Sequence, residues 1–279
     1  MMKKYFVTYA DFNFSEAKER IAKEALLTHE FDDVIAYGPE DVSERLRKSS
    51  IFNEVRGGGL WSWKPDVILK TLNRMADGDA LVYCDAGCSI YPGHEWTKIW
   101  NLLGHFEIVA SRIYQRNDRW TRREILEAFK CNGHYWQYCY QFMATIIIII
   151  KSPFVVNFVS EWRDAMIDHP EFVRDVTREE RNAQHSSFIE NRHDQAVYSA
   201  LIYKYLHTKK IYAMWEHMED NDIIKKQVIR ATRLKGKRQE SRMTTAKKSC
   251  KRLFKDLLWK PFVIAPCQFL FFKLNEMSK

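Results

Sequence analysis

Several features that would place this chain in a special class are missing from its sequence. Its six cysteines stand at positions 84, 88, 131, 139, 250 and 267. None forms a Cys-x-x-Cys pair, which excludes a zinc ribbon. The first residues hold no apolar run of the kind that forms a signal peptide, so we expect free thiols in a reducing cytoplasm. The longest apolar runs, 144–150 and 261–272, are too short to span a bilayer.

The sequence also lacks an internal repeat, a Walker A motif and the glycine pattern of a Rossmann dinucleotide site. Its 279 residues are 46% hydrophobic and 29% charged, which is typical of a soluble globular protein with a sizeable core. This length suits one large domain with an appendage, or two modest domains.

Positive charge is concentrated toward the carboxyl end. Residues 223–279 contain 16 Lys and Arg against 3 Asp and Glu, whereas residues 1–222 contain 28 basic and 33 acidic side chains. A basic body would indicate a nucleic-acid partner, but a basic tail on a mildly acidic body favours an anionic surface. We therefore predict a body at 1–222 and a basic helical tail at 223–279.

Strands and helices are predicted to alternate along the body. Aromatic and β-branched residues predict strands at 5–10, 33–37, 80–84, 106–111 and 144–150. Apolar residues at helical spacing predict helices at 16–27, 39–46, 65–75, 94–103, 121–129, 153–167 and 192–205. This order predicts an α/β fold in which helices flank a mixed, mostly parallel sheet.

Three helix starts carry a capping signal. Thr121 with Glu124 has the spacing of a capping box, and Ser152 precedes a proline at the first helical position. Asn191 is expected to cap the last helix of the body. The polar segment 168–190 between the last two helices is expected to form an ordered active-site loop or a mobile lid.

The segment 56–91 contains the most informative pattern of the chain. A glycine-rich turn and two tryptophans precede a helix, and a buried strand then ends on Asp85. Ligands of open α/β sheets bind beyond the carboxyl ends of strands, where Ala86 and Gly87 leave space. A carboxylate at this point can also cap a turn, but the glycine-rich approach favours a binding site.

This pattern resembles a family of enzymes. The run Gly-Gly-Gly-x-Trp-x-Trp-Lys-Pro at 57–65, followed by Gly-Asp-x-x-x-Tyr-x-Asp-Ala-Gly-Cys at 78–88, is similar to bacterial glycosyltransferases that build surface polysaccharide and have the Rossmann-like GT-A fold. Asn-Arg-His-Asp-Gln at 191–195 strengthens the resemblance. Thr-Tyr-Ala-Asp at 8–11 resembles the first-strand loop of glycogenin-like transferases. The resemblance covers roughly residues 3 to 206.

The resemblance implies a site for a nucleotide-diphosphate sugar. Tyr9 and Asp11 would flank the base and ribose, and Lys64 lies before a helix amino terminus, where phosphate binding is favoured. A strand end with a cap nearby is an equal alternative for Tyr9 and Asp11, and core packing is the alternative for Trp61. The positions assigned to the donor site are Thr8, Tyr9, Asp11, Arg56, Trp61, Lys64, Asp85, Ala86, Gly87 and Gln195.

The same resemblance implies two catalytic carboxylates, Asp85 and Asp194. Asp194 would act as the acid/base or position the acceptor, while Gln195 holds a sugar hydroxyl. Both carboxylates have a structural alternative. Asp85 can cap a turn, and Asp194 near a helix amino terminus can simply stabilise the helix dipole.

Metal dependence is left open by one departure from the family pattern. Asp85 takes the first acidic position of the Asp-x-Asp element, but Gly87 stands where the second acid normally binds Mn²⁺ or Mg²⁺. A cation is still required near the diphosphate, because negative charge develops on this leaving group in the transition state. Either Asp85 with His193 or Asp194 holds a metal, or the positive charge comes from Lys64, Arg56 and Arg192.

These motifs predict a glycosyltransferase of hexosyltransferase type, cytoplasmic and peripheral on the inner membrane. Its donor would be a nucleotide sugar such as a UDP-sugar, and its acceptor a lipid-linked glycan of lipopolysaccharide or capsule. No nucleic-acid partner is expected. The alternative is a non-catalytic protein that binds a nucleotide or a nucleic acid and uses the basic tail.

The tail itself predicts membrane attachment. Between 247 and 260 lysines and arginines interleave with leucines, Phe254 and Trp259, as in an amphipathic helix on an anionic membrane. The alternative is a helix packed on its own domain. Truncation at about Ser241 is expected to abolish co-flotation with anionic vesicles; equal flotation of the full and truncated chains would contradict the membrane assignment.

Overall fold

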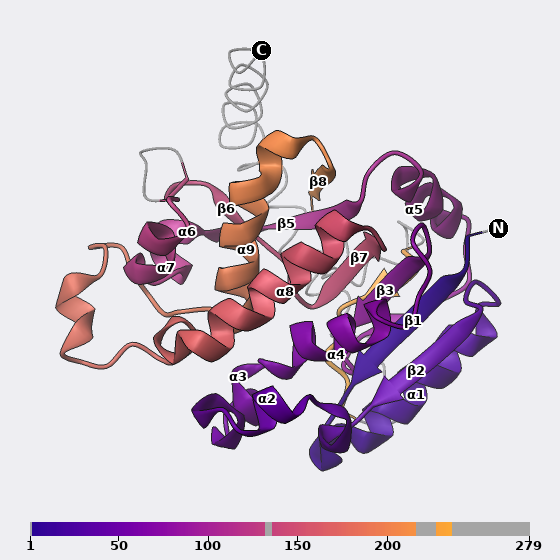
Figure 1. The fold of residues 1–279 in the computed structure, drawn as a ribbon, viewed down its shortest axis with the longest axis horizontal. Coiled ribbons are helices and arrows are strands. Elements are labelled where there is room, and N and C mark those ends of the chain that lie inside the picture. Colours follow the sequence, from indigo (N-terminus) through magenta and orange to yellow (C-terminus); the bar gives the residue numbers. More distant parts are fainter. Residues whose placement is uncertain (1, 132–135, 216–226, 236–279) are drawn as a thin grey trace, which may run out of the picture.

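A computed structural model describes residues 2–131, 136–215 and 227–235. Its centre is a seven-stranded sheet with the order β2-β1-β3-β7-β5-β6, in which β8 also pairs with β5 (Figure 1). The strands β2, β1, β3, β5 and β8 run in one direction and β7 and β6 oppose them. The predicted α/β class, a mixed and mostly parallel sheet flanked by helices, is confirmed. The sheet strands are β1 (Lys4–Tyr9), β2 (Asp33–Tyr37), β3 (Ala80–Cys84), β5 (Ile108–Arg116), β6 (Tyr140–Phe142), β7 (Ile146–Ile150) and β8 (Ile211–Trp215).

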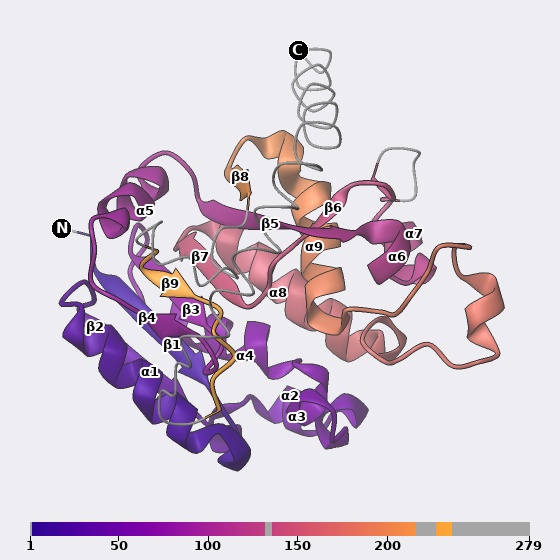
Figure 2. The same cartoon turned by 180° about the vertical axis from the view of Figure 1, so that it is seen from behind.

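Helices cover both faces of the sheet (Figures 1 and 2). Side chains alternate along β3, so that Leu81 and Tyr83 join the core under α4, α8 and α9, while Val82 and Cys84 join the core under α1 and α5. The sheet is therefore buried on both sides. The helices are α1 (Ser15–Leu27), α2 (Glu44–Arg47), α3 (Gly57–Leu60), α4 (Trp63–Leu72), α5 (Glu95–Leu103), α6 (Asn117–Trp120), α7 (Arg123–Ala128), α8 (Pro153–Asp168) and α9 (His193–Tyr205).

The isoleucine run of β7 lies in the middle of the sheet, as its composition predicts. It is antiparallel to both of its neighbours, β3 and β5. An apolar run reports burial on two faces but carries no information on strand direction, which explains why the reversal was not predicted.

Of the three predicted helix-capping residues, Ser152 is confirmed, whereas the predictions for Thr121 and Asn191 are wrong. Ser152 accepts the Val155 N–H at 3.1 Å and caps α8. Thr121 instead donates to the side chain of Asn117, and α7 begins after Arg122 without a side-chain cap. Asn191 is turned toward the loops, where its amide donates to the Phe172 carbonyl at 2.7 Å.

Two predicted elements have different bounds. The helix expected at 39–46 is interrupted at Val42, whose extended backbone (φ −67°, ψ 152°) separates the 3-10 turn Pro39–Asp41 from α2. The strand expected at 106–111 begins at Ile108 and continues to Arg116, because β6 pairs with its second half.

A second, two-stranded ribbon joins distant parts of the chain. It pairs β4 (Ser89–Ile90) with β9 (Ile229–Arg230) in antiparallel register. We call the segment 227–235 that contains β9 the strap; it crosses the body in Figure 2, although it lies within the region assigned to the tail. The amphipathic stretch at 247–260 lies outside the described residues.

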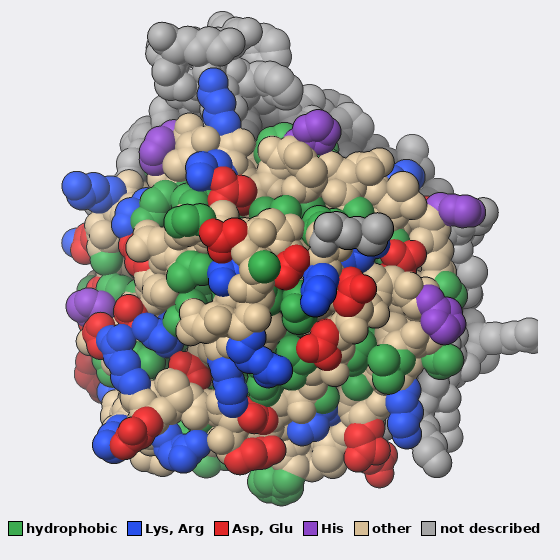
Figure 3. All heavy atoms as spheres, turned by 45° about the vertical axis from the view of Figure 1, so that its right-hand side comes forward, with side chains coloured by type: hydrophobic (Ala, Val, Ile, Leu, Met, Phe, Trp, Pro, Cys, Tyr) green, Lys and Arg blue, Asp and Glu red, His purple; other side chains and the backbone are tan. Residues whose placement is uncertain are grey.

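The surface of the body agrees with its nearly balanced charge. On the face in Figure 3, basic and acidic side chains are interspersed. Within the described ranges, none of the helices is both long and apolar enough to pass through a lipid bilayer.

Packing between α8 and α9 is expected to contribute strongly to stability. Phe158 on α8 is 1% exposed, whereas Phe12 is 83% exposed. Phe158→Ala is therefore expected to lower the free energy of unfolding by about 3–5 kcal/mol. The matched Phe12→Ala change should stay within about 0.5 kcal/mol. Equal costs in denaturant titrations would contradict this core assignment.

Candidate functional site

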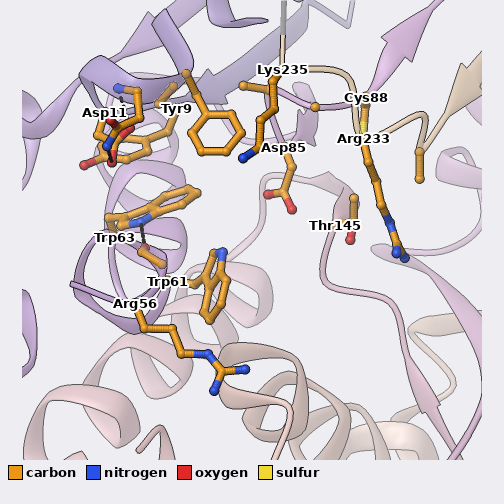
Figure 4. A pocket seen from close by; sticks show the side chains of 18 of the residues that line it. Tyr9, Asp11, Arg56, Trp61, Trp63, Asp85, Cys88, Thr145, Arg233 and Lys235 are labelled. Carbon is orange, nitrogen blue, oxygen red and sulfur yellow. Dashed lines mark hydrogen bonds between the residues drawn. The ribbon is translucent and has the colours of Figure 1, made fainter. Parts of the chain in front are cut away.

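A cavity of about 600 Å³ opens at the carboxyl ends of β1 and β3 (Figure 4). Its walls come from five segments of the chain. They are the end of β1 with the residues after it, the glycine turn before α4, the turn after β3, Thr145 before β7, and the strap. The cavity therefore lies at the sheet edge where open α/β folds bind ligands.

The glycine turn is a left-handed turn. Five successive residues have positive φ: Gly57 (64°), Gly58 (57°), Gly59 (94°), Leu60 (53°) and Trp61 (60°). The Leu60 N–H donates to the Arg56 carbonyl at 2.8 Å. This backbone costs roughly 1–2 kcal/mol for each residue with a Cβ, which accounts for the glycines.

Space as well as backbone conformation requires two of these glycines. A Cβ on Gly57 would meet the Trp61 ring at 2.5 Å, and one on Gly59 would meet the Phe52 Cα at 3.1 Å. Gly58 instead faces the open cavity, with Asp11 Oδ2 the nearest atom to its Cβ position at 3.6 Å. The turn thus brings bare backbone and the Trp61 ring to the cavity wall.

The end of β1 and the residues after it form the adjoining wall, but Thr8 is not part of it. Tyr9 stacks on Trp63 with ring centroids 4.0 Å apart and an interplanar angle of 16°. Burial, followed by the charge of Asp11, raises the pKa of Tyr9, so its phenol stays neutral. Asp11 lines the cavity and also accepts the Asn13 N–H at 3.0 Å, so it caps a turn as well. Thr8 is fully buried and lies behind this wall.

Beneath the cavity a buried lysine joins two carboxylates. Lys64 Nζ lies 2.7 Å from Asp194 Oδ2 and 3.3 Å from Asp85 Oδ1. The Tyr83 hydroxyl donates to the same Asp85 oxygen at 2.7 Å. The Asp85 side chain is 29% exposed, against 3% for Lys64 and 8% for Asp194. Asp85 alone of the three lines the cavity.

The electrostatics of this cluster follow from burial. Burial opposes the charge of Lys64, but Asp194 and Asp85 outweigh it and raise the pKa of the ammonium. Burial raises the pKa of the Asp194 carboxyl, and Lys64 offsets part of that effect. Burial and Asp85 hold the pKa of Tyr83 well above its usual range, so Tyr83 remains a donor. When Lys64, Asp85 and Asp194 are all ionised, the cluster has a net charge of minus one, and Asp85 exposes part of it to the cavity.

Asp194 is therefore placed differently from the prediction. It starts α9 but reaches the cavity only through Lys64, and the Trp162 indole donates to its carbonyl at 3.1 Å. Lys64 is likewise absent from the cavity wall. The geometry describes Asp194 and Lys64 as residues that position Asp85; a direct catalytic role for Asp194 stays a prediction.

His193 and Arg56 meet at a different partner, Asp175. His193 has a φ of 51°, and its Nε2 lies 3.1 Å from Asp175 Oδ1. Arg56 binds both oxygens of Asp175 at 2.7 Å while also lining the cavity. Burial and Arg56 lower the pKa of His193, so the ring is neutral. Asp175 thus links the loop before α9 to the glycine turn.

The remaining predicted positions separate into two groups. Ala86 and Gly87 line the cavity. Gln195 lies away from its wall, where its amide donates to Gln115 at 3.1 Å and to Gln141 at 2.7 Å. Arg192 also lies elsewhere, paired with Glu190 at 2.9 Å.

Several residues of the site were not predicted from the sequence. Arg20 donates to the carbonyls of Ala86 and Cys88 at 3.0 and 2.9 Å and so holds the turn after Asp85. Phe14, Arg233 and Lys235 line the cavity. No local motif marks them, since Arg20 lies 66 residues from Ala86 and the strap more than 140 residues from the same turn.

Searches against known proteins add a fold-level comparison. Neither a protein-family model nor a curated protein matches the chain. Among solved structures, a galactosyltransferase, LgtC, in complex with donor and acceptor sugar analogs is 19% identical, with a TM-score of 0.35 over 71% of this chain and 70% of that chain.

Two further solved structures also have a low similarity to this chain. A glycosyltransferase involved in glycosylation of the major capsid of PBCV-1 is 7% identical, with a TM-score of 0.45 over 89% of this chain and 99% of that one. The glycosyltransferase GlyE of Streptococcus pneumoniae TIGR4 is 14% identical, with a TM-score of 0.43 over 89% and 60%. All three TM-scores lie below 0.5.

The buried cluster makes a prediction about stability. Lys64→Met leaves two carboxylates without their cation, so it is expected to lower the free energy of unfolding by about 3–5 kcal/mol. Lys70→Met is the matched control on the same helix, because its pair with Asp41 is 2.9 Å long but its side chain is 41% exposed. The control should cost no more than about 1 kcal/mol. Similar costs for both variants in urea titrations would contradict the cluster.

Proposed function

We propose that the chain is a GT-A glycosyltransferase of hexosyltransferase type that takes its sugar from a nucleotide-diphosphate donor such as a UDP-sugar. The observation that carries the proposal is Asp85, held over a buried lysine at the floor of a cavity at the carboxyl ends of β1 and β3. Tyr83 and Lys64 hold one oxygen of this carboxylate, and its 29% exposure leaves it accessible to a sugar hydroxyl or a ribose in the cavity.

The cavity has the size and surface that such a donor requires. Its volume of about 600 Å³ is in the range of small-molecule sites, roughly 300–1,000 Å³. Asp11 offers oxygens for a ribose, and Trp61 and Phe14 offer aromatic surface for a base or a sugar ring. Gly58, next to Asp11, allows close approach of the donor to the backbone, because no side chain projects there.

The reaction breaks the bond between the anomeric carbon and the β-phosphate oxygen. Both electrons of that bond leave with the nucleoside diphosphate, the acceptor hydroxyl oxygen forms the new bond to carbon, and its proton passes to water. Asp85 would orient the donor, and the Lys64–Asp194 pair would keep Asp85 in place. A preorganised arrangement of this kind lowers the barrier because no group has to reorient during the step.

The acceptor is proposed to be a lipid-linked glycan of surface-polysaccharide synthesis, lipopolysaccharide or capsule. The support is the charge distribution, with 16 basic and 3 acidic residues at 223–279 beside a mildly acidic body. A basic tail would hold the enzyme at the anionic cytoplasmic surface of the inner membrane, where such an acceptor is exposed.

Binding and turnover of nucleotide sugars test this proposal. One nucleotide sugar of a panel is expected to raise the thermal midpoint of the full chain, because it binds the folded state alone. Asp85→Asn is expected to reduce release of the nucleoside diphosphate by about 100-fold or more. Asp77→Asn is the control, since that side chain is 66% exposed at the surface. Full activity of Asp85→Asn, or tight salt-sensitive oligonucleotide binding without any sugar-nucleotide binding, would contradict the proposal.

A further inference from the structure

The strap is fastened to the turn that carries Asp85. The Leu234 N–H donates to the Gly87 carbonyl at 3.0 Å, and the Thr232 hydroxyl donates to the same carbonyl at 2.9 Å. Thr232 also bonds the Ser89 hydroxyl at 2.9 Å, next to the β4–β9 ribbon. The position of the strap relative to Asp85 is therefore set by several bonds.

Gly87 is the residue that lets the strap come so close. A Cβ at this position would lie 3.3 Å from the Arg233 Cα and 3.8 Å from the Leu234 nitrogen, which are backbone atoms. The space that a second acidic side chain would occupy in an Asp-x-Asp element is thus filled by the strap. Glycine replaces the second acid at position 87, and the strap passes close to the same position. The two observations therefore describe one structural feature.

The residues around Asp85 do not fit a divalent metal. Asp85 Oδ1 is already shared between Tyr83 and Lys64, and His193 is paired with Asp175. Within residues 2–131, 136–215 and 227–235, no three His, Cys, Asp or Glu side chains come together in a group that could hold a metal ion. A Mn²⁺ or Mg²⁺ site of the Asp-x-Asp kind requires at least the second carboxylate that Gly87 replaces.

The cations expected from the sequence are also engaged elsewhere. Lys64 is 3% exposed between two carboxylates, and Arg192 pairs with Glu190 away from the cavity. Arg56 reaches the cavity wall, but its Nη1 donates to both oxygens of Asp175 at 2.7 Å. Lys64, Arg56 and Arg192 are thus each bound to a carboxylate. None of these three neutralises the negative charge of the Asp85 cluster from the cavity side.

The strap supplies cations at this point. Arg233 and Lys235 both line the cavity. In Figure 4 Lys235 extends from the strap toward Asp85, and Arg233 runs along the other side of the cavity near Thr145. The Lys235 ammonium lies 5.3 Å from the centre of the Phe14 ring, and none of the carboxylates in the described ranges lies within ion-pair distance of it.

We propose that Arg233 and Lys235 bind the diphosphate of the donor in place of a divalent metal ion, and that Gly87 is required to bring them there. This proposal rests on the proposed function. The two cations would neutralise the diphosphate on binding and stabilise the charge that develops on it as the glycosidic bond breaks. A guanidinium is suited to two phosphate oxygens at once, whereas the ammonium acts as a point charge.

Calorimetric titration of UDP into the full chain tests the proposal. The affinity for UDP is expected to agree within about twofold in excess EDTA and in Mn²⁺. Lys235→Met and Arg233→Met should each weaken UDP binding about tenfold in EDTA. Lys235→Arg should restore most of it, while uridine, which has no phosphate, should bind all variants equally. Lys98→Met is the control, since Lys98 is an exposed lysine of α5 outside the cavity wall.

The possible failures are distinguishable. UDP binding that requires Mn²⁺ and is unchanged in Lys235→Met would overturn the strap proposal and leave the glycosyltransferase proposal standing. Absence of UDP binding in both buffers, with no nucleotide sugar of the panel raising the thermal midpoint of the folded chain, would overturn both. Gly87→Asp gives an independent check: it is expected to weaken UDP binding by displacing the strap, and a gain of Mn²⁺-dependent affinity in that variant would contradict the role assigned to Gly87.

Discussion

The ammonium group of Lys64 lies between two carboxylates from different elements, and the geometry of the site depends on this contact. Lys64 comes from the first turn of α4, Asp85 from the end of β3 and Asp194 from the start of α9. Removing one member of such a buried group leaves an uncompensated charge, which costs several kcal/mol. The cluster therefore fixes the two helices to the strand end and determines where the Asp85 carboxylate points.

The cavity above this cluster is assembled from segments that need special backbone. The glycine turn follows a left-handed path through Trp61, and the turn after Asp85 relies on Gly87 because the strap passes over it. Strained or crowded backbone of this kind persists where the surrounding structure supports it, and it is concentrated at functional sites. In this protein both features border the same cavity.

Much of the architecture could be predicted because it depends on local hydrophobic patterns. The strand ending on Asp85, the cap at Ser152 and the buried β7 all follow from periodicity and composition. The direction of β7 could not be predicted, because an apolar run is compatible with either direction. The cap expected at Asn191 is absent, because its amide satisfies a loop carbonyl, a tertiary contact that a capping pattern does not report.

The site was predicted least well where it depends on long-range contacts. Asp85, Gly87 and Arg56 line the cavity as expected, but Asp194 reaches it only through Lys64. The strap was assigned to the tail because charge balance changes near residue 222, whereas its position is set by pairing with β4. Charge composition describes a segment on average and cannot report such a pairing.

The most direct test of this account is a crystal structure of the full chain with UDP, grown once in EDTA and once with Mn²⁺. The account predicts UDP in the cavity in both crystals, with its ribose at Asp11 and its diphosphate between Gly87 and the side chains of Arg233 and Lys235. UDP bound elsewhere, or a diphosphate held by a Mn²⁺ ion on Asp85, would contradict it.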